Sequence, residues 1–176
     1  MLSRSVRAVG LNHVSVSAID LPTSVRFYRD VLGLVEVPTP RFAFPVQWMR
    51  LGDQQLHLFV REGVVAPSYH HVALDVDDFE ATWERANELG IHDDSAFFAD
   101  IYELPDGSVQ MYLRDPAGNL IEIDWPDVNS LDLDRLPEIT KLADTVEQSS
   151  ETMQARLYTR SAELPGGQRT APRSAT

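Results

Sequence analysis

The chain has 176 residues, 43% of them hydrophobic, a length that suits one compact unit or two small fused modules. It has no cysteine, so a bound metal would take its ligands from imidazole, carboxylate, amide oxygen or water. The formal net charge of −12 argues against nucleic acid and against an anionic membrane surface, because both attract clustered positive charge. A small molecule is therefore the expected partner.

The sequence gives no sign of a membrane segment. It has no run approaching the roughly 18 uninterrupted apolar residues that a membrane-spanning helix needs. Its N-terminus, MLSRSVRAVG, lacks the apolar core of a signal peptide. We therefore expect a cytoplasmic location and no membrane partner.

A repeated segment organises most of the chain. The sequence NHVSV at 12–16 reappears as HHVAL at 70–74. An acidic residue follows each copy at the same distance, Asp20 in the first and Asp78 in the second, and apolar residues then recur at helical spacing. Both acidic residues suit a helix N-cap. Each copy therefore begins with a strand and a capped helix.

The two copies also end alike. A glycine, Gly33 or Gly90, follows each helical pattern and is typical of the residue just past a helix. Further strand-like segments separated by turn residues come next. In the last of these, Leu56-His57-Leu58 matches Ile121-Glu122-Ile123. Each copy therefore has the pattern of a βαβββ module.

These patterns predict an α+β fold: two tandem βαβββ modules closing into a barrel-like curved sheet, with a C-terminal helical extension. Apolar residues at helical spacing within 136–158 indicate the helix of that extension. The expected parts are an N-terminal segment (1–10), module 1 (11–61), a linker (62–69), module 2 (70–126), the helical extension (127–163) and a flexible tail (164–176).

Alternation along the strands places four polar side chains on the face of each sheet that lies away from the helix. Neighbouring residues of a strand point to opposite sides, so if the flanking apolar residues pack on the helix, His13 and His71 face away from it. The same argument applies to His57 and Glu122, which alternate with apolar residues on the closing strands. His70, next to His71, has the opposite parity. The faces carrying the four side chains would meet when the two sheets close.

A structural explanation fits each histidine taken alone, because imidazole is tolerated in cores and on surfaces. Glu122 lies within the apolar run Leu120–Ile123, where a buried carboxylate is costly without a compensating cation. Four such groups at repeat-equivalent positions predict a divalent-metal site formed by His13, His57, His71 and Glu122.

The segments that carry these residues resemble the vicinal-oxygen-chelate superfamily, which includes glyoxalases, an epimerase, extradiol dioxygenases, fosfomycin-resistance transferases and metal-free drug-binding proteins. They are LNHVSVSAIDLPTSVRFYRDVLGL, LHLF, HHVALDVDD and RDPAGNLIEID. The residues before LHLF, at 41–48, also look like those of lactoylglutathione lyase-related proteins. The resemblance covers roughly 11–125, and the four candidate ligands fall on the family's ligand positions.

The resemblance implies a metal ion with two open positions, where neighbouring oxygens of a substrate would bind. Three imidazoles and a carboxylate suit Fe, Mn, Co, Ni or Zn and leave the choice open. In the glyoxalase pattern the position of Glu122 supplies the base, which implies a lyase or isomerase that removes a proton next to a carbonyl. His57 departs from that pattern, because glyoxalase I commonly has a carboxylate there and the epimerase an amide.

Two other classes stay open. The segment from Met111 to Glu122 looks like the later part of the extradiol dioxygenase signature, in which Tyr112 would assist oxygen chemistry at Fe(II). The histidine that opens that signature is missing from 100–110, and His57 adds a ligand to the usual two-histidine, one-carboxylate set. The other class is a metal-free protein that binds or sequesters a small molecule or drug.

Aromatic residues provide candidates for a substrate pocket. Phe44, Trp48 and Phe59 are expected to line it, and Phe59 shares the parity of His57. Arg41 is a candidate for binding a substrate carboxylate. The short linker makes pairing of modules across two chains plausible, so we expect a homodimer.

Overall fold

The computed structural model describes residues 10–97 and 99–158, which form two compact units. The first unit comprises the chain up to Pro67 together with the turn Asp115–Asn119, and the second comprises Ser68–Arg114 and the chain from Leu120 onward. The tail expected at 164–176 lies outside the described residues. Among those that are described, no helix has the length and apolar character needed to span a membrane.

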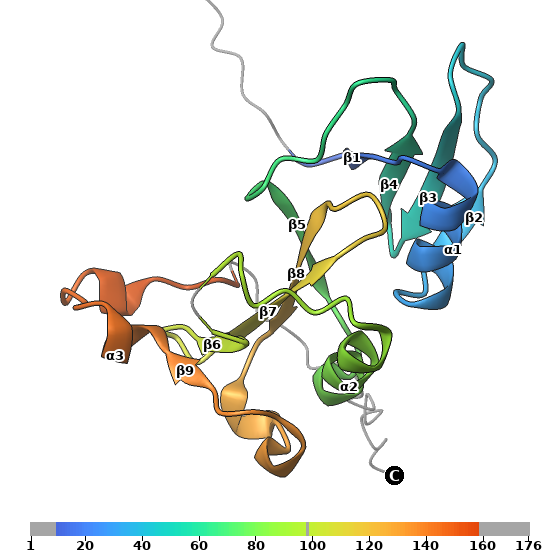
Figure 1. The fold of residues 1–176 in the computed structure, drawn as a ribbon. Helices are drawn as coiled ribbons and strands as arrows, with labels where there is room; N and C mark the ends of the chain where they lie inside the picture. The colour runs from blue at the N-terminus through green and yellow to red at the C-terminus, as the bar shows by residue number, and fades with distance from the viewer. Residues whose placement is uncertain (1–9, 98, 159–176) are drawn as a thin grey trace, which may run out of the picture. The chain divides into compact units, whose positions relative to one another are not determined.

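The first unit is a βαβββ module with a four-stranded sheet in the order β1-β4-β3-β2 (Figure 1). Its elements are β1 (His13–Ser17), α1 (Leu21–Asp30), β2 (Val35–Val37), β3 (Val46–Leu51) and β4 (Gln54–Phe59). The first and last strands, β1 and β4, lie side by side and run parallel. The other pairs are antiparallel.

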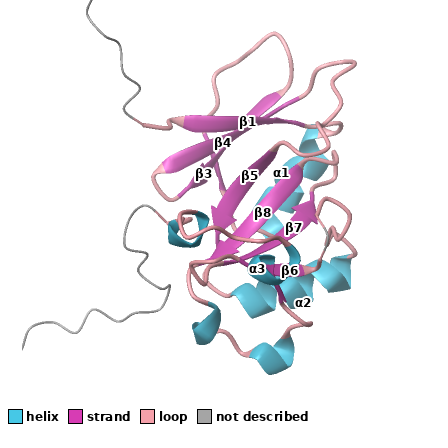
Figure 2. Cartoon of the chain, turned by 90° about the vertical axis from the view of Figure 1, so that its left-hand side faces the viewer, coloured by secondary structure: helices cyan, strands magenta, loops and turns pink. Residues whose placement is uncertain are grey.

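The second unit repeats this order and adds one strand. Figure 2 shows β5, β8 and β7 next to one another, within a sheet whose full order is β5-β8-β7-β6-β9. The elements are β5 (His71–Asp75), α2 (Phe79–Leu89), β6 (Ile101–Glu103), β7 (Val109–Arg114), β8 (Leu120–Trp125) and β9 (Thr140–Lys141). Here too the first and last strands of the module, β5 and β8, are parallel.

The predicted α+β duplication is therefore confirmed, with one difference. The strands make two separate sheets rather than one closed, barrel-like sheet. The outer strands are β1 and β2 in the first sheet and β5 and β9 in the second, and none of the four pairs with the other sheet.

The helix caps expected from the repeat are present. The Asp20 carboxylate accepts a hydrogen bond from the Thr23 backbone N–H at 2.9 Å, and Asp78 accepts one from Ala81 at 2.8 Å. Helix α2 ends at Gly90, whose φ of +64° lies in the left-handed region that glycine enters without strain.

Each helix covers the apolar face of its own sheet. The large buried side chains include Tyr28, Met49, Leu56 and Leu58 in the first unit, and Phe79, Met111, Leu113, Ile121 and Ile123 in the second. Helix α1 packs on β3 and β4, and helix α2 packs on β8. Burying each of these large side chains contributes about 1.5–3 kcal/mol. The residues that alternate with them on the strands face the other side of each sheet.

A buried carboxylate organises the turn Asp115–Asn119. Asp115 accepts hydrogen bonds from the Tyr28 hydroxyl at 3.0 Å and from the Asn119 backbone N–H at 2.8 Å. The Asn119 amide also donates to the Ser17 carbonyl oxygen at 2.7 Å. Within the first unit, these bonds fix the turn that leads into β8 against β1 and α1.

The C-terminal extension differs from the expected helix over 136–158. Only Leu142–Thr145 is α-helical, and single 3₁₀ turns form at Val128–Ser130, Leu133–Arg135 and Thr152–Gln154. Val146 and Met153 are 51% and 43% exposed, so a helix here would have little apolar surface to pack against. The Ser149 hydroxyl also accepts from the Thr152 N–H and so offers the backbone an alternative to helix.

Asp93 is a buried charge of the second unit, 8% exposed, and forms an ion pair with Arg114. Burial alone would raise its pKa, but hydrogen bonds from Ser95, Arg114 and Ala96 outweigh burial and lower the pKa from 3.8 to about 2. A carboxyl whose pKa is lower in the folded than in the unfolded chain stabilises the fold above the unfolded value. This stabilisation disappears as the pH falls towards 2.

We predict that Asp93→Asn lowers the free energy of unfolding by about 1–3 kcal/mol at pH 7, because Arg114 loses its charged partner. The difference from the parent chain should shrink between about pH 4 and pH 2, as urea unfolding would measure. Glu84→Gln is the matched control, since it removes the carboxylate of an exposed pair with Arg135 and should change little. A difference for Asp93→Asn that is constant with pH would contradict this account.

Candidate functional site

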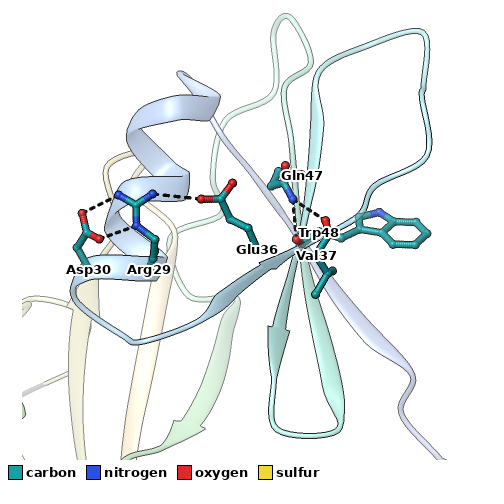
Figure 3. Close-up of polar contacts among 6 residues, drawn as sticks. All are labelled: Arg29, Asp30, Glu36, Val37, Gln47 and Trp48. Carbon is teal, nitrogen blue, oxygen red and sulfur yellow. Dashed lines mark hydrogen bonds and ion pairs between the residues drawn. The ribbon is translucent and has the colours of Figure 1, made fainter.

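Two of the predicted ligands meet in the first unit. The rings of His13 and His57 are stacked, with centroids 4.1 Å apart. The ring of Trp48 stacks on His57 with centroids 4.5 Å apart. The strand register explains the second contact, because Trp48 on β3 pairs directly with His57 on β4. Figure 3 shows the Trp48 ring on the side of the sheet away from α1 and Arg29, while the neighbouring Gln47 turns the other way.

Hydrogen bonds occupy one nitrogen of each of these imidazoles. His13 Nδ1 lies 2.8 Å from the side-chain oxygen of Asn12, and His57 Nε2 lies 2.9 Å from that of Gln55. An amide oxygen can only accept, so each of these ring nitrogens carries the hydrogen. A neutral ring then keeps a lone pair on its other nitrogen. Burial and the nearby His13 lower the pKa of His57, which favours its neutral form at pH 7.

A cavity of about 510 Å³ opens beside this pair, within the first unit. The predicted substrate-binding residues Phe44, Trp48 and Phe59 line it, and Arg41 does not. The lining is His13, Ser15, Phe42, Phe44, Val46, Trp48, His57, Phe59 and Arg61. The volume lies in the range typical of small-molecule sites, and the walls are mostly aromatic and aliphatic.

The other two predicted ligands meet in the second unit. His71 Nε2 lies 3.3 Å from Glu122 Oε2. His71 Nδ1 is 2.9 Å from the Tyr69 carbonyl oxygen and must donate to it. The Nε2 atom therefore faces the carboxylate. Alternation on the parallel strands β5 and β8 brings these two side chains to the same face.

Neighbouring strand residues hold the Glu122 carboxylate. Tyr112 donates its hydroxyl to Oε2 at 2.5 Å, and Gln110 donates its amide to Oε1 at 2.6 Å. Burial, then the hydrogen bond to Glu122, raises the pKa of Tyr112, so the tyrosine stays protonated as a donor. Phe97 stacks on the Tyr112 ring at 4.4 Å. The carboxylate thus has a fixed orientation.

A second buried carboxyl lies beside Glu122. Gln110 also donates to Asp124 at 3.2 Å, and Glu122 and Asp124 are only 5% and 6% exposed. Burial, together with the charge of Glu122, raises the pKa of Asp124. Among the described residues, neither carboxylate forms an ion pair with Lys or Arg. In the described part of the chain, His71 is therefore the basic side chain that pairs with this face of β8, and neither Lys nor Arg does so.

The structure thus brings the four predicted ligands together as two pairs, each within its own unit. In the part of the chain that is described, no group of three or more His, Asp or Glu is close enough to hold a metal ion. The remaining histidines do not join either pair. His70 is exposed, and His92 lies against Trp83 with Nε2 3.2 Å from the Asp100 carbonyl oxygen.

Sequence reasoning missed two residues of these faces. Arg61 lines the cavity, and the signal was available, because it continues the alternation of His57 and Phe59. Gln110 shares the parity of Tyr112 and so could be placed on the face of Glu122. Its bond to both carboxylates depends on the register of β7 against β8, which the sequence alone does not give.

The chain combines duplicated βαβββ modules with imidazole and carboxylate groups on their polar faces. This combination is typical of a class of proteins that bind small molecules, and the sequence comparison gives the family. Residues 10–123 match the model of the Glyoxalase/Bleomycin resistance protein/Dioxygenase superfamily. The chain belongs to this superfamily.

The curated relatives carry out different reactions. The chain is 34% identical over 85 residues to the mitochondrial methylmalonyl-CoA epimerase of Mus musculus. This match covers 40% of the chain and 48% of the relative. It is 32% identical over 90 residues to the metallothiol transferase FosB of Staphylococcus haemolyticus, covering 47% and 63%. The chain thus spans about half to two thirds of these relatives. Because their names denote different reactions, these relatives do not select a reaction for this chain.

Solved structures show the same fold at low identity. A glyoxalase family protein from Bacillus anthracis superposes with a TM-score of 0.55 at 24% identity, over 68% of this chain and 97% of that one. Lactoylglutathione lyase from Agrobacterium tumefaciens gives a TM-score of 0.53, also at 24% identity, over 70% and 98%. These likenesses concern the fold alone.

Proposed function

We propose that the chain is a divalent-metal-dependent lyase or isomerase of the glyoxalase type, acting on a small substrate. In this proposal His13, His57, His71 and Glu122 are the ligands of one metal ion, which is Fe, Mn, Co, Ni or Zn. The observation that carries the proposal is the pairing of His71 with a buried Glu122, on a face where no Lys or Arg of the described residues pairs with the buried carboxyl groups.

The donor chemistry of the four residues fits a divalent ion. Each of the three imidazoles uses one ring nitrogen in a hydrogen bond to an oxygen, which fixes the ring and leaves the other nitrogen as a donor to metal. A bound cation would offset the desolvation of Glu122 and Asp124. Three nitrogen ligands and one carboxylate favour the first-row metals over calcium, which prefers oxygen.

When bound, the metal would act as a Lewis acid that stabilises negative charge on a substrate oxygen. Glu122 is the proposed base, which accepts the proton from the carbon next to a carbonyl. Tyr112 and Gln110 act as positioning residues, because each donates to one Glu122 oxygen and so fixes the direction of the carboxylate. The aromatic residues beside His57 would provide an apolar surface for the substrate.

An Fe(II) dioxygenase is the competing enzyme class, and Tyr112 is the residue on which the two differ. Its hydroxyl donates to Glu122 and its ring stacks on Phe97. Both contacts support a role in orienting the carboxylate rather than in oxygen chemistry. A metal-free binding protein is the third class, and the metal-content measurement below separates it from both enzymes.

We predict that the purified protein binds about one divalent metal ion per completed site, as metal analysis after dialysis would measure. His13→Ala, His71→Ala or Glu122→Ala should remove most of the metal, because each variant loses one of the four ligands and leaves the others poorly compensated. His57→Gln should retain more, since an amide oxygen is itself a metal ligand. His70→Ala is the matched control and should keep the metal. Full retention in His13→Ala, His71→Ala and Glu122→Ala would exclude these residues as ligands.

We further predict that turnover persists without oxygen and survives replacement of iron by a redox-inert ion. A substrate proton should exchange with solvent deuterium, and Glu122→Gln should stop the exchange, because an amide cannot accept the proton. Tyr112→Phe should slow the exchange only about 10-fold or less, the effect of one lost hydrogen bond of about 1 kcal/mol. Stoichiometric uptake of oxygen with consumption of a catechol would instead support the dioxygenase.

The expected homodimer stays a prediction. We expect sedimentation of the purified chain at micromolar concentration to give the mass of two chains. A monomer that retains its metal would contradict this expectation and would leave the proposed ligands unaffected.

A further inference from the structure

The cavity of the first unit combines an apolar wall with a single strong cation. Phe42, Phe44, Trp48 and Phe59 supply the wall, and Arg61 is the one lining residue that carries a permanent charge. The lining contains no carboxylate. This composition favours a ligand with a flat apolar body and one negative group.

The contacts of Arg61 leave it able to bind such a negative group. Its guanidinium carbon lies over the Phe44 ring, 4.4 Å from the ring centroid, in a cation–π contact. Such a contact does not consume the guanidinium N–H donors, which can bind a carboxylate in bidentate fashion. Among the described residues, no carboxylate forms an ion pair with Arg61.

The negative net charge of the chain makes the positive charge of Arg61 important for binding an anion. At −12 the protein repels anions on average, so an anionic ligand needs a local attraction to enter. Arg61 supplies that attraction in a cavity that His13 and His57 also line.

We propose that this cavity binds carboxylates that carry an aromatic ring. The ring would lie between the aromatic walls and the carboxylate on Arg61, with the opposite end of the molecule towards His13 and His57. Arg61 is thus a specificity-determining residue. If these carboxylates are the substrates, the inference rests on the proposed function. Their binding to the cavity does not itself require the metal.

The test uses metal-free protein and calorimetric titration with 3-phenylpropanoate and its neutral amide, 3-phenylpropanamide. We expect the parent chain to bind the carboxylate about 10-fold more tightly than the amide, as one charge-assisted contact would give. Arg61→Gln should abolish this preference and Arg61→Lys should keep part of it. Arg26→Gln is the matched control, because Arg26 is exposed on α1 and does not line the cavity, and it should keep the full preference.

Equal affinities for the acid and the amide in the parent chain would overturn the proposal, as would an undiminished preference in Arg61→Gln. Circular dichroism of each variant verifies that it is folded. The result is independent of the metal measurements: loss of the acid preference with metal binding intact refutes only the substrate class, and absence of metal with the acid preference intact refutes only the proposed reaction.

Discussion

The parallel pairing of the first and last strands of each module is the constraint on which the rest of the structure depends. In the first unit His13 pairs with Gln55, and in the second His71 pairs with Leu120. The other member of each pair, His57 or Glu122, lies two residues further along, on the same face. A shift of one residue in either register would turn that side chain into the apolar layer beneath the helix.

The same register between the first and last strands thus places the paired side chains in two different chemical environments. In the first unit Trp48 flanks the pair of imidazoles, and the pair lines an aromatic cavity that Arg61 also lines. In the second unit the imidazole faces a carboxylate that Tyr112 and Gln110 hold in place. The duplication therefore gives one module an aromatic cavity beside its imidazoles and the other a buried carboxylate with a fixed orientation.

The sequence predicted most of this arrangement because alternation along a strand and capping of a helix are local effects. The repeat, the caps Asp20 and Asp78, and the faces of the paired residues follow from neighbours in the chain. The contacts of Gln110 depend on pairing between strands, and Arg61 lies just past the strand to which the pattern was applied. The C-terminal helix was expected from apolar spacing alone, yet helical spacing stabilises a helix only where a surface covers its apolar face.

The most direct test of the central claim is to count the imidazoles around the metal. X-ray absorption of the zinc-loaded protein reports the number of histidine ligands through their characteristic outer-shell scattering, with Zn–N distances of about 2.0–2.1 Å. If His13, His57 and His71 act with Glu122, the parent chain should give three imidazoles and His57→Gln should give two. A spectrum with one imidazole or none in the parent chain would contradict the four-ligand site.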